Sequence, residues 1–473
     1  MDRRPFALAL DWTLGITCAC LTGSIPALAQ PHLWPPEPAP EGMTLRWTDA
    51  GPSRAYTVQV RDRLQGGLWL LPGPNTAWPI SERQWIDFAA PPPARFYRVL
   101  AVPAAERGRL LTSRFDRTMT RLEITLLLQA IGVSLPPLHD VRLYKFTYET
   151  IGPWGERTHA SAALVVPVTP GRAWPLFSYQ HGTIVRTNDA PSAMNPYGEL
   201  AVGLVFASRG FVSVLPDYLG LGDSPGLHPY HHARSEATAC VDALRAARTL
   251  CAQQAVSLND QLFLAGYSQG GHATLALHRE IEFFHTNEFN LIASAPMAGA
   301  YDLSGVTTED VLSSRPQPNP YYFAYLLAAY QSVYELTNRL ADLLVPPYDS
   351  MLPPRFNGQF SGSEINAVMP SNPLLILKPE VLAAFRNDPD HPLRLALRDN
   401  DLHRWRPTRA LRLYHCSGDA DVVFANSEVA LQSFHQQGAT HVQLFNPVPG
   451  GSHGDCVYPS LLSALQWFES LRR

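Results

Sequence analysis

The stretch Gly266-Tyr-Ser-Gln-Gly270 constrains the fold of this 473-residue chain more than any other feature of its sequence. It follows the apolar run Gln261-Leu-Phe-Leu-Ala265, which is typical of a buried strand, and it precedes a helix-like segment. A strand that turns this sharply into a helix leaves no room for a Cβ at either flanking glycine. Such a turn lifts Ser268 above the sheet, where a histidine can take its hydroxyl proton. The N–H of Gln269 then faces the place where an oxyanion would form.

Two later segments can supply the acid and the base that such a serine needs. The turn Cys416-Ser-Gly-Asp-Ala-Asp421 follows a strand-like run and carries two carboxylates. We predict that Asp421 is the acid, because it stands three residues after a glycine and has apolar residues behind it. Asp419, nearer the start of the turn, is interpreted as a capping residue. His453, in the glycine-rich loop 449–456, is the predicted general base because it follows the acid in chain order.

A second oxyanion donor is expected in the loop after an earlier strand. The strand-like run 174–180 ends in His181-Gly-Thr183, where the glycine permits a close backbone approach. We predict that the N–H of Thr183 is the donor, with Gly182 as the alternative. Asp217, which closes the next predicted strand, is interpreted as a structural residue that binds loop amides.

With these motifs, and with Pro216-Asp-Tyr-Leu-Gly-Leu-Gly222, the chain resembles an α/β-hydrolase of the secreted lipase and esterase group from about residue 141 to its end. The resemblance implies an α/β fold with an eight-stranded, mostly parallel sheet and helices on both faces. It also implies a Ser-His-Asp triad, here Ser268, His453 and Asp421, that acts on carboxylic esters without a cofactor. Eight apolar, β-rich runs between residues 141 and 445 support this independently.

The remaining residues suggest neither a metal site nor a nucleic-acid partner. His228, His231 and His232 lie close together in sequence, but no carboxylate or cysteine spacing typical of a metal site accompanies them. The formal net charge of −4 is small, and basic residues form no stripe. The expected partner is therefore a small or polymeric ester substrate, and the oligomeric state stays open.

The first 29 residues have the charged, apolar and small-residue regions of a secretory signal peptide, with cleavage expected after Ala27-Leu-Ala29. Later segments contain no apolar run of about 18 residues, so a secreted or periplasmic protein without a membrane span is expected. Export favours disulfides, and a Cys416–Cys456 bond would join the predicted acid and base loops. Cys240 and Cys251 lie on one helix-like stretch, about 16 Å apart if that helix is continuous, and are interpreted as free thiols unless it breaks.

Further segments surround the predicted catalytic domain, residues 141–473. Residues 30–42 are interpreted as a proline-rich linker, 43–103 as a β-sandwich resembling a fibronectin type III domain, and 104–140 as a helical connector. The tryptophans of the sandwich could form a binding platform, but a role in its small core is favoured. An insertion at about residues 300–408 is expected to form a helical, aromatic-rich cap over the active site. Within it, the strongly aromatic run 321–331 and residues 333–344 are both expected to be helical.

Two other functions compete with ester hydrolysis. A serine peptidase of the prolyl-oligopeptidase type uses the same triad, but the residues before 141 are too few for its β-propeller. A non-enzymatic binding protein with a hydrolase fold typically lacks a triad member, whereas every triad position is filled here.

Overall fold

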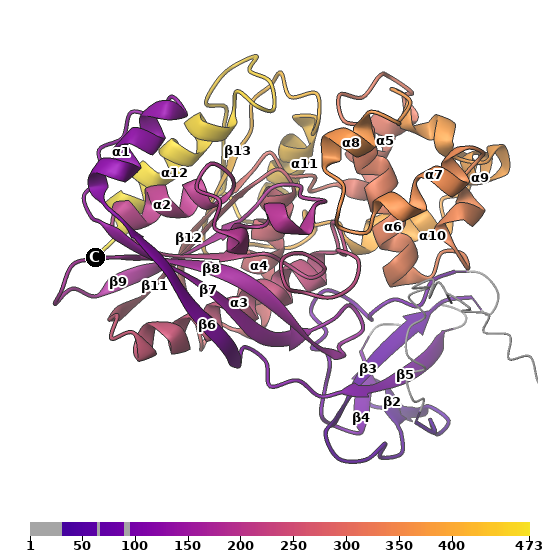
Figure 1. Ribbon diagram of the computed structural model, residues 1–473. Coiled ribbons are helices and arrows are strands. Elements are labelled where there is room, and N and C mark those ends of the chain that lie inside the picture. The colour runs from indigo at the N-terminus through magenta and orange to yellow at the C-terminus, as the bar shows by residue number, and fades with distance from the viewer. Residues whose placement is uncertain (1–30, 64–66, 89–94) are drawn as a thin grey trace, which may run out of the picture.

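The computed structural model describes residues 31–63, 67–88 and 95–473 (Figure 1). The predicted signal peptide, residues 1–29, lies outside the described residues. Within the described residues, no helix is both long and apolar enough to cross a membrane.

A nine-stranded sheet runs through the centre of the molecule, with helices on both faces (Figure 1). Its strand order is β14-β13-β12-β11-β9-β10-β8-β7-β6, and five of its eight pairings are parallel. The three antiparallel pairings join β6, β7, β8 and β10 at one edge. The predicted mixed, mostly parallel sheet is confirmed, with one strand more than expected. The strands are β6 (Leu110–Met119), β7 (Val141–Ile151), β8 (Arg157–Pro167), β9 (Trp174–Gln180), β10 (Val212–Pro216), β11 (Leu258–Tyr267), β12 (Asn290–Met297), β13 (Ala410–Tyr414) and β14 (Gln443–Phe445).

The ninth strand, β6, lies in the segment that the sequence predicts to be a helical connector. A helix is predicted within residues 104–140, but β6 occupies 110–119 and pairs with β7 along its length. Helix α1 (Arg121–Ala130) begins only after Thr120, whose side chain forms a capping box with Glu123. Pairing with a neighbouring strand, which a single sequence does not reveal, therefore overrides the helical propensity of the first part of this segment.

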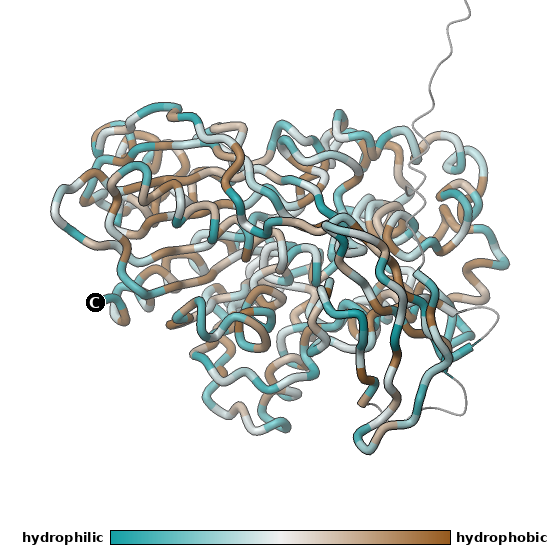
Figure 2. Tube along the Cα trace, turned by 90° about the horizontal axis from the view of Figure 1, so that it is seen from below, coloured by the Kyte–Doolittle hydropathy of each residue, from teal (hydrophilic) through white to brown (hydrophobic). Residues whose placement is uncertain are grey.

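Both faces of the sheet are buried, as its parallel part requires. Along β11, Phe263 and Ala265 pack with α1, α2 and α12, whereas Leu262 and Leu264 pack with α3 and α4 on the other face. Figure 2 shows the hydrophobic residues gathered along these inner segments. Cys240 and Cys251 are both buried free thiols on the continuous helix α3, which decides the pairing that the sequence leaves open. The helices beside the sheet are α1, α2 (Leu200–Ser208), α3 (Ala233–Gln253), α4 (Gln269–Phe284), α11 (Ala425–Gln436) and α12 (Val457–Leu471).

The predicted insertion forms a separate helical lobe between β12 and β13, drawn in orange in Figure 1. Its apolar core lies around Tyr325, Leu327 and Tyr330 of α6 and also includes Leu68 and Tyr230 from outside the insertion. The aromatic helix predicted at 321–331 is confirmed as α6, but a second helix over 333–344 is wrong. Only the short 3-10 turn Leu340–Leu343 forms there, followed by extended residues and a cis proline bond. The helices are α5 (Thr308–Leu312), α6 (Tyr321–Tyr334), α7 (Tyr348–Met351), α8 (Gly362–Asn366), α9 (Pro379–Asn387) and α10 (Pro392–Asp399).

The described N-terminal residues form two small antiparallel sheets that lie beneath the insertion in Figure 1. Their shared core contains Trp47 and Tyr56. Trp47 and Trp78 are buried, which supports a structural role for these tryptophans rather than a binding platform. Strand β1 lies inside the predicted linker, so that segment is partly structured, and the fibronectin type III resemblance stays a prediction. The strands are β1 (Glu37–Ala39), β2 (Gly42–Arg46), β3 (Arg54–Arg61), β4 (Gln84–Asp87) and β5 (Phe96–Pro103).

Candidate active site

Ser268 lies at the turn between β11 and α4, as the sequence predicts. Its backbone has φ 60° and ψ −120°, a conformation that costs free energy for any residue with a Cβ. The Ser268 N–H donates to the carbonyl of Met297 on β12 (2.9 Å), and its own carbonyl accepts from Gly271 (2.9 Å). These bonds hold the strained turn at the carboxyl end of the parallel strands, where ligands bind in open α/β sheets.

The two flanking glycines are required by space. A Cβ built on Gly270 would lie 1.9 Å from the carbonyl oxygen of Gln180 on β9. One built on Gly266 would lie 2.4 Å from the carbonyl oxygen of Gly270. Both contacts are with backbone atoms, which cannot rotate away as a side chain can. The steric reason given for this motif is therefore confirmed.

His453 lies in the loop after β14 and is held from two sides. Its Nδ1 donates to Oδ2 of Asp419 at 2.5 Å. Its carbonyl accepts from the hydroxyl of Tyr267 (2.6 Å), the residue before Ser268, and the centroids of the Tyr267 and His453 rings lie 5.0 Å apart. The histidine is thus anchored to the same strand end that presents Ser268.

The choice of Asp421 as the acid is wrong. The Asp421 carboxylate points toward the insertion, where Oδ1 accepts from Nδ2 of Asn319 at 2.7 Å. Asp419, interpreted from the sequence as a capping residue, both caps the turn with one carboxylate oxygen and contacts His453 with the other. Oδ1 accepts the N–H groups of Asp421 and Val422 (both 2.9 Å), which orients the carboxylate so that Oδ2 meets His453.

A second histidine, His415, was not recognised from the sequence. Its Nε2 lies 3.1 Å from Oδ2 of Asp419, and both side chains are completely buried. Burial alone would raise the pKa of Asp419, but the hydrogen bonds from His415 and His453 outweigh it and hold that pKa well below its usual value. The carboxylate is therefore ionised at neutral pH. The only sequence signal for His415 is its position four residues before Asp419.

The predicted disulfide between Cys416 and Cys456 is present, with the two Cα atoms 5.8 Å apart. Each cysteine lies three residues from a member of the Asp419–His453 pair. The bond joins two loops that are distant in sequence and thereby limits their relative movement.

The His181-Gly-Thr183 loop lies beside the nucleophile. A Cβ built on Gly182 would be 4.0 Å from the Cβ of Ser268, so the backbone of this loop approaches the serine closely. The Thr183 hydroxyl bonds to the hydroxyl of Tyr230 (2.9 Å). Asp217, as predicted, is structural: it is completely buried, and its carboxylate accepts from Ser161 (2.5 Å) and from the N–H of Ser192 (2.9 Å).

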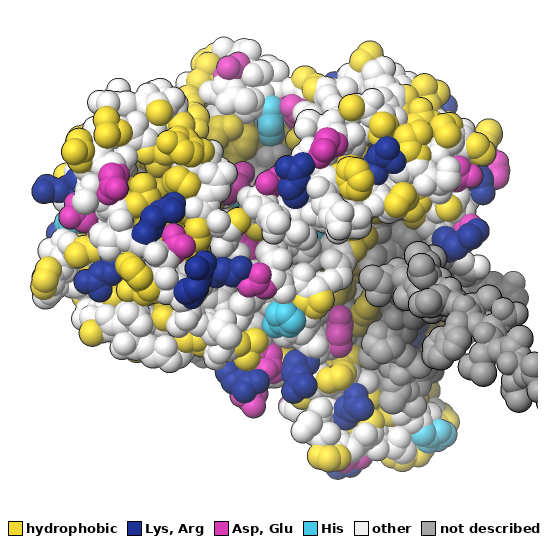
Figure 3. Space-filling view, viewed as in Figure 1, with side chains coloured by type: hydrophobic (Ala, Val, Ile, Leu, Met, Phe, Trp, Pro, Cys, Tyr) yellow, Lys and Arg dark blue, Asp and Glu magenta, His cyan; other side chains and the backbone are white. Residues whose placement is uncertain are grey.

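A largely apolar pocket of about 100 Å³ lies between the insertion and the acid loop. Tyr230, Tyr322 and Phe323 line it, with Asn319 and Asp421 among its polar groups. Figure 3 shows the surface hollowed between the two lobes of the molecule. Through Tyr230, which bonds to Thr183, the pocket adjoins the loop beside Ser268.

The structure brings a carboxylate close to His231, one of the three histidines that lie close together in the sequence. Ligand atoms of His231, Glu236 and His272 all lie within 4.8 Å of one another, and so do those of Asp302, Asp401 and His403. In the first group, however, the two nitrogens of His272 already bond to Glu236 (2.7 Å) and to the carbonyl of Asn400 (3.0 Å). In the second, Asp302 and Asp401 accept loop N–H groups. Hydrogen bonding thus accounts for Glu236, His272, Asp302 and Asp401, whereas Nδ1 of His231 is buried without a hydrogen-bond partner among the described residues.

Comparisons with known proteins agree with this architecture. The family model described as "Secretory lipase" matches residues 200–304, which include Ser268. No curated protein matches the chain. Among solved structures, the rice cell wall degrading esterase LipA from Xanthomonas oryzae is 32% identical, with a TM-score of 0.70 over 77% of this chain and 100% of that one.

Two further structures extend the comparison. A putative hydrolase from Legionella pneumophila is 29% identical, with a TM-score of 0.71 over 77% of this chain and 98% of that one. Lipase A from Candida antarctica is 15% identical, with a TM-score of 0.59 over 77% of this chain and 82% of that one, and shows a shared fold only. Fold, site and relatives together define a carboxylic ester hydrolase of the α/β-hydrolase type. The chain belongs to the secretory lipase family. This membership and the disulfide indicate an extracellular or periplasmic protein.

Proposed function

We propose that the protein is a secreted serine hydrolase that cleaves carboxylic esters through Ser268, His453 and Asp419. The observation that carries the proposal is the 2.5 Å hydrogen bond between His453 and Asp419, formed next to the strained turn that presents Ser268. This combination of a lifted serine, a histidine and a buried carboxylate is the arrangement that activates a serine hydroxyl.

In the proposed reaction, Nε2 of His453 takes the hydroxyl proton of Ser268 as Oγ attacks the ester carbonyl. Asp419 keeps the Nδ1 proton in place and stabilises the imidazolium that forms. His453 then protonates the leaving alcohol, and an acyl-enzyme remains. Water, deprotonated by the same histidine, releases the acid and restores Ser268.

The negative charge that develops on the carbonyl oxygen needs hydrogen-bond donors. Gln269 is the first residue of α4, and N–H groups in the first helical turn have no partner within the helix. We assign its N–H as one donor and that of Thr183, in the loop whose Gly182 faces Ser268, as the other. The positive end of the α4 dipole adds to this stabilisation.

The pocket beneath the insertion is assigned to part of the substrate. Pockets for drug-sized ligands measure about 300–1,000 Å³. A cavity of about 100 Å³ that adjoins the Thr183 loop therefore favours a short acyl or small alcohol group. Polymeric esters with short substituents remain compatible, because only the substituent would enter the pocket.

Export is assigned to a signal peptide, residues 1–29, cleaved before Gln30. Family membership and the disulfide support this assignment. N-terminal sequencing of protein recovered outside the cytoplasm tests it, and an uncleaved N-terminus would contradict it.

Hydrolysis of p-nitrophenyl esters from acetate to palmitate tests the activity, with Ser268→Ala as the inactive variant and exposed Ser470→Ala as the matched control. We expect turnover that requires Ser268 and is fastest for short acyl chains. A fluorophosphonate probe should label the wild type and S470A but not S268A. Absence of both turnover and labelling would overturn the proposed triad, whereas labelling with turnover of peptides alone would indicate a serine peptidase.

A further inference from the structure

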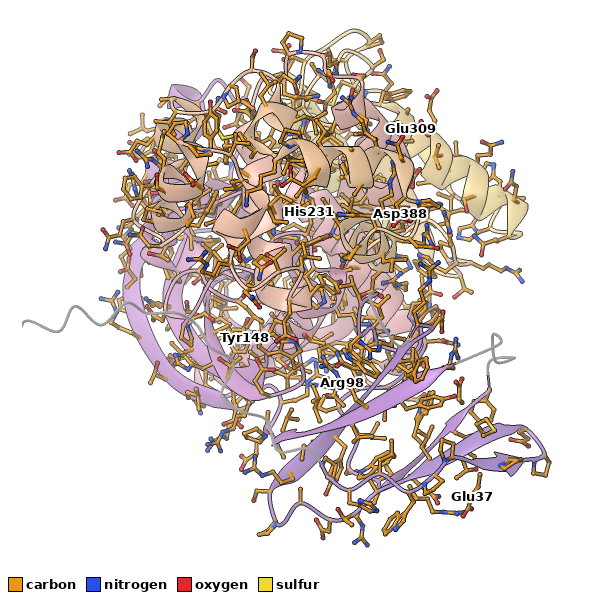
Figure 4. The ribbon with its side chains drawn as sticks, turned by 90° about the vertical axis from the view of Figure 1, so that its right-hand side faces the viewer. Glu37, Arg98, Tyr148, His231, Glu309 and Asp388 are labelled. Carbon is orange, nitrogen blue, oxygen red and sulfur yellow. A yellow bond between two sulfur atoms is a disulfide. The ribbon has the colours of Figure 1, made fainter. Side chains whose placement is uncertain are left out.

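The side chain of Gln269, the residue after the nucleophile, is held in a buried network formed by Gln269, His228, Glu236, His272 and Asn400, called the elbow network below. Its Nε2 donates to Nε2 of His228 (2.7 Å) and to Oε1 of Glu236 (2.8 Å). Each of the five side chains belongs to a residue no more than 1% exposed. In Figure 4, the neighbouring His231 lies in the middle of the molecule, between the insertion and the sheet.

The protonation state of His228 determines which way the side-chain amide of Gln269 faces. Nδ1 of His228 donates to the carbonyl of Leu219 (2.8 Å), so Nε2 carries the lone pair. Burial lowers the pKa of His228 to about 4, which keeps the ring neutral and able to accept. The two amide hydrogens of Gln269 therefore each have one acceptor, His228 and Glu236, and a flipped amide would lose both bonds.

Glu236 is oriented in turn by His272. Oε2 of Glu236 accepts from Nδ1 of His272 (2.7 Å), while Nε2 of that ring faces the carbonyl of Asn400 (3.0 Å). The Glu236 carboxylate and the Asn400 carbonyl thus hold the His272 ring from both sides. Burial would raise the pKa of Glu236, but its interactions with His272 lower it to about 2. The two side chains form a buried hydrogen-bonded pair.

The elbow network connects three parts of the chain. Glu236 lies in the first turn of α3, His272 one turn after Ser268 in α4, and Asn400 directly after α10 at the end of the insertion. Asn400 is itself fixed, because its Oδ1 accepts from the N–H of Ala233 (2.8 Å) and its Nδ2 donates to the hydroxyl of Tyr334 (2.7 Å). Gln269 is thus tied to α3 and to the insertion rather than to its own helix alone.

We propose that Glu236 is a positioning residue for ester hydrolysis, holding Gln269 so that its backbone N–H meets the oxyanion. The inference rests on the proposed function. Glu236 does not touch the reacting atoms. Burying the Glu236 carboxylate costs desolvation free energy, which offsets much of what its hydrogen bonds contribute to stability. The Glu236–His272 pair instead holds the Gln269 side chain, next to Ser268, in a single orientation.

A double-mutant cycle with Glu236→Gln and Gln269→Ala tests whether Glu236 acts through Gln269. Both variants keep the backbone N–H of residue 269. We expect E236Q to lower kcat about 10- to 100-fold, below the 10²–10³ cost of deleting an oxyanion donor, with KM changed less than about threefold. Q269A should have a similar effect, and E236Q should add almost nothing in the Q269A background. Exposed Glu428→Gln is the matched control, with kcat and KM unchanged.

The melting temperature of each variant separates positioning from loss of fold. If E236Q does not fold, His228→Gln tests the same idea, because it alters the other acceptor of Gln269 and leaves the Glu236–His272 hydrogen bond intact. This variant too should lower kcat and not KM. Additive effects in the cycle, or an unchanged kcat in E236Q or folded H228Q, would overturn the proposal while leaving the esterase assignment in place. If the wild type shows no Ser268-dependent turnover or labelling, the proposed function fails and the role of Glu236 fails with it.

Discussion

The two halves of the candidate site are built differently. The serine half, residues 266–271, is one continuous turn. At Gly266, Gly270 and Gly271 a Cβ would collide with nearby backbone atoms, so only glycine fits at these positions. The acid–histidine half joins residues 34 positions apart through a side-chain hydrogen bond, and a disulfide with a sequence separation of 40 holds their loops together. The first half is thus determined by local sterics, and the second by contacts that exist only after folding.

The largest expected effect tests which carboxylate serves the histidine. Asp419→Asn should lower kcat about 10⁴-fold, because an amide no longer favours the required tautomer of His453. Asp421→Asn, two residues away, should cost less than about tenfold, since Asp421 bonds to Asn319 instead. Steady-state hydrolysis of a short p-nitrophenyl ester by both variants measures the difference. A greater loss in D421N than in D419N would restore the sequence-based assignment.

The serine half should tolerate far less substitution than the histidine loop. Gly270→Ala places a Cβ 1.9 Å from the carbonyl oxygen of Gln180, and we expect it to lower the free energy of unfolding by more than about 4 kcal/mol or to prevent folding. Gly454→Ala, next to His453, meets no atom within 4 Å and should stay within about 0.5 kcal/mol of the wild type. Urea unfolding of both variants gives the comparison. Equal destabilisation would contradict the steric distinction between the halves.

Removing the disulfide should weaken the acid–histidine half specifically. The Cys416→Ala, Cys456→Ala double variant is expected to lose about 2–5 kcal/mol of unfolding free energy, together with part of its kcat. Cys251→Ala, which removes a buried free thiol on α3, is the control and should leave kcat unchanged. Urea midpoints and ester turnover under non-reducing conditions provide the test. Full activity and stability in the double variant would show that the loops hold their positions without the bond.

The buried histidines beside the serine half and Asp419 of the acid–histidine half should respond to acid in different pH ranges. Burial lowers the pKa of His228 to about 4 and those of His231 and His232 to about 3, from an ordinary 6.5. Below pH 6.5 the unfolded chain binds protons that the folded chain does not. Each histidine therefore lowers the free energy of unfolding by up to about 1.4 kcal/mol for every unit by which the pH is lowered.

Asp419, whose pKa is lowered on folding, stabilises the protein above its ordinary pKa of 3.8 and loses this contribution only at lower pH. Between pH 6.5 and 4.5 the loss of stability should therefore come from these buried histidines and not from Asp419. Urea unfolding at pH 7, 6 and 5 measures it for the wild type and for His231→Gln, with exposed His441→Gln as the control. A stability that does not change over this range would contradict the buried, neutral state of the histidines.

Much of the fold follows from local patterns. Short apolar runs mark the parallel strands, because both of their faces are buried, and the aromatic run at 321–331 marks α6. The edge strand β6 could not be recognised in this way. Most of its residues are exposed or half-buried, and its partner β7 begins more than 20 residues later, so its hydrogen bonds depend on pairing rather than on composition.

The sequence by itself determined the serine half, the place of His453 in chain order and the pairing of Cys416 with Cys456. It did so because steric exclusion at Gly266 and Gly270 acts over a few residues, and because only two cysteines flank the two loops. Only the tertiary structure decided between Asp419 and Asp421. Both are short carboxylates in one turn. The direction of each side chain depends on a partner that the rest of the fold brings to that turn, His453 for Asp419 and Asn319 for Asp421.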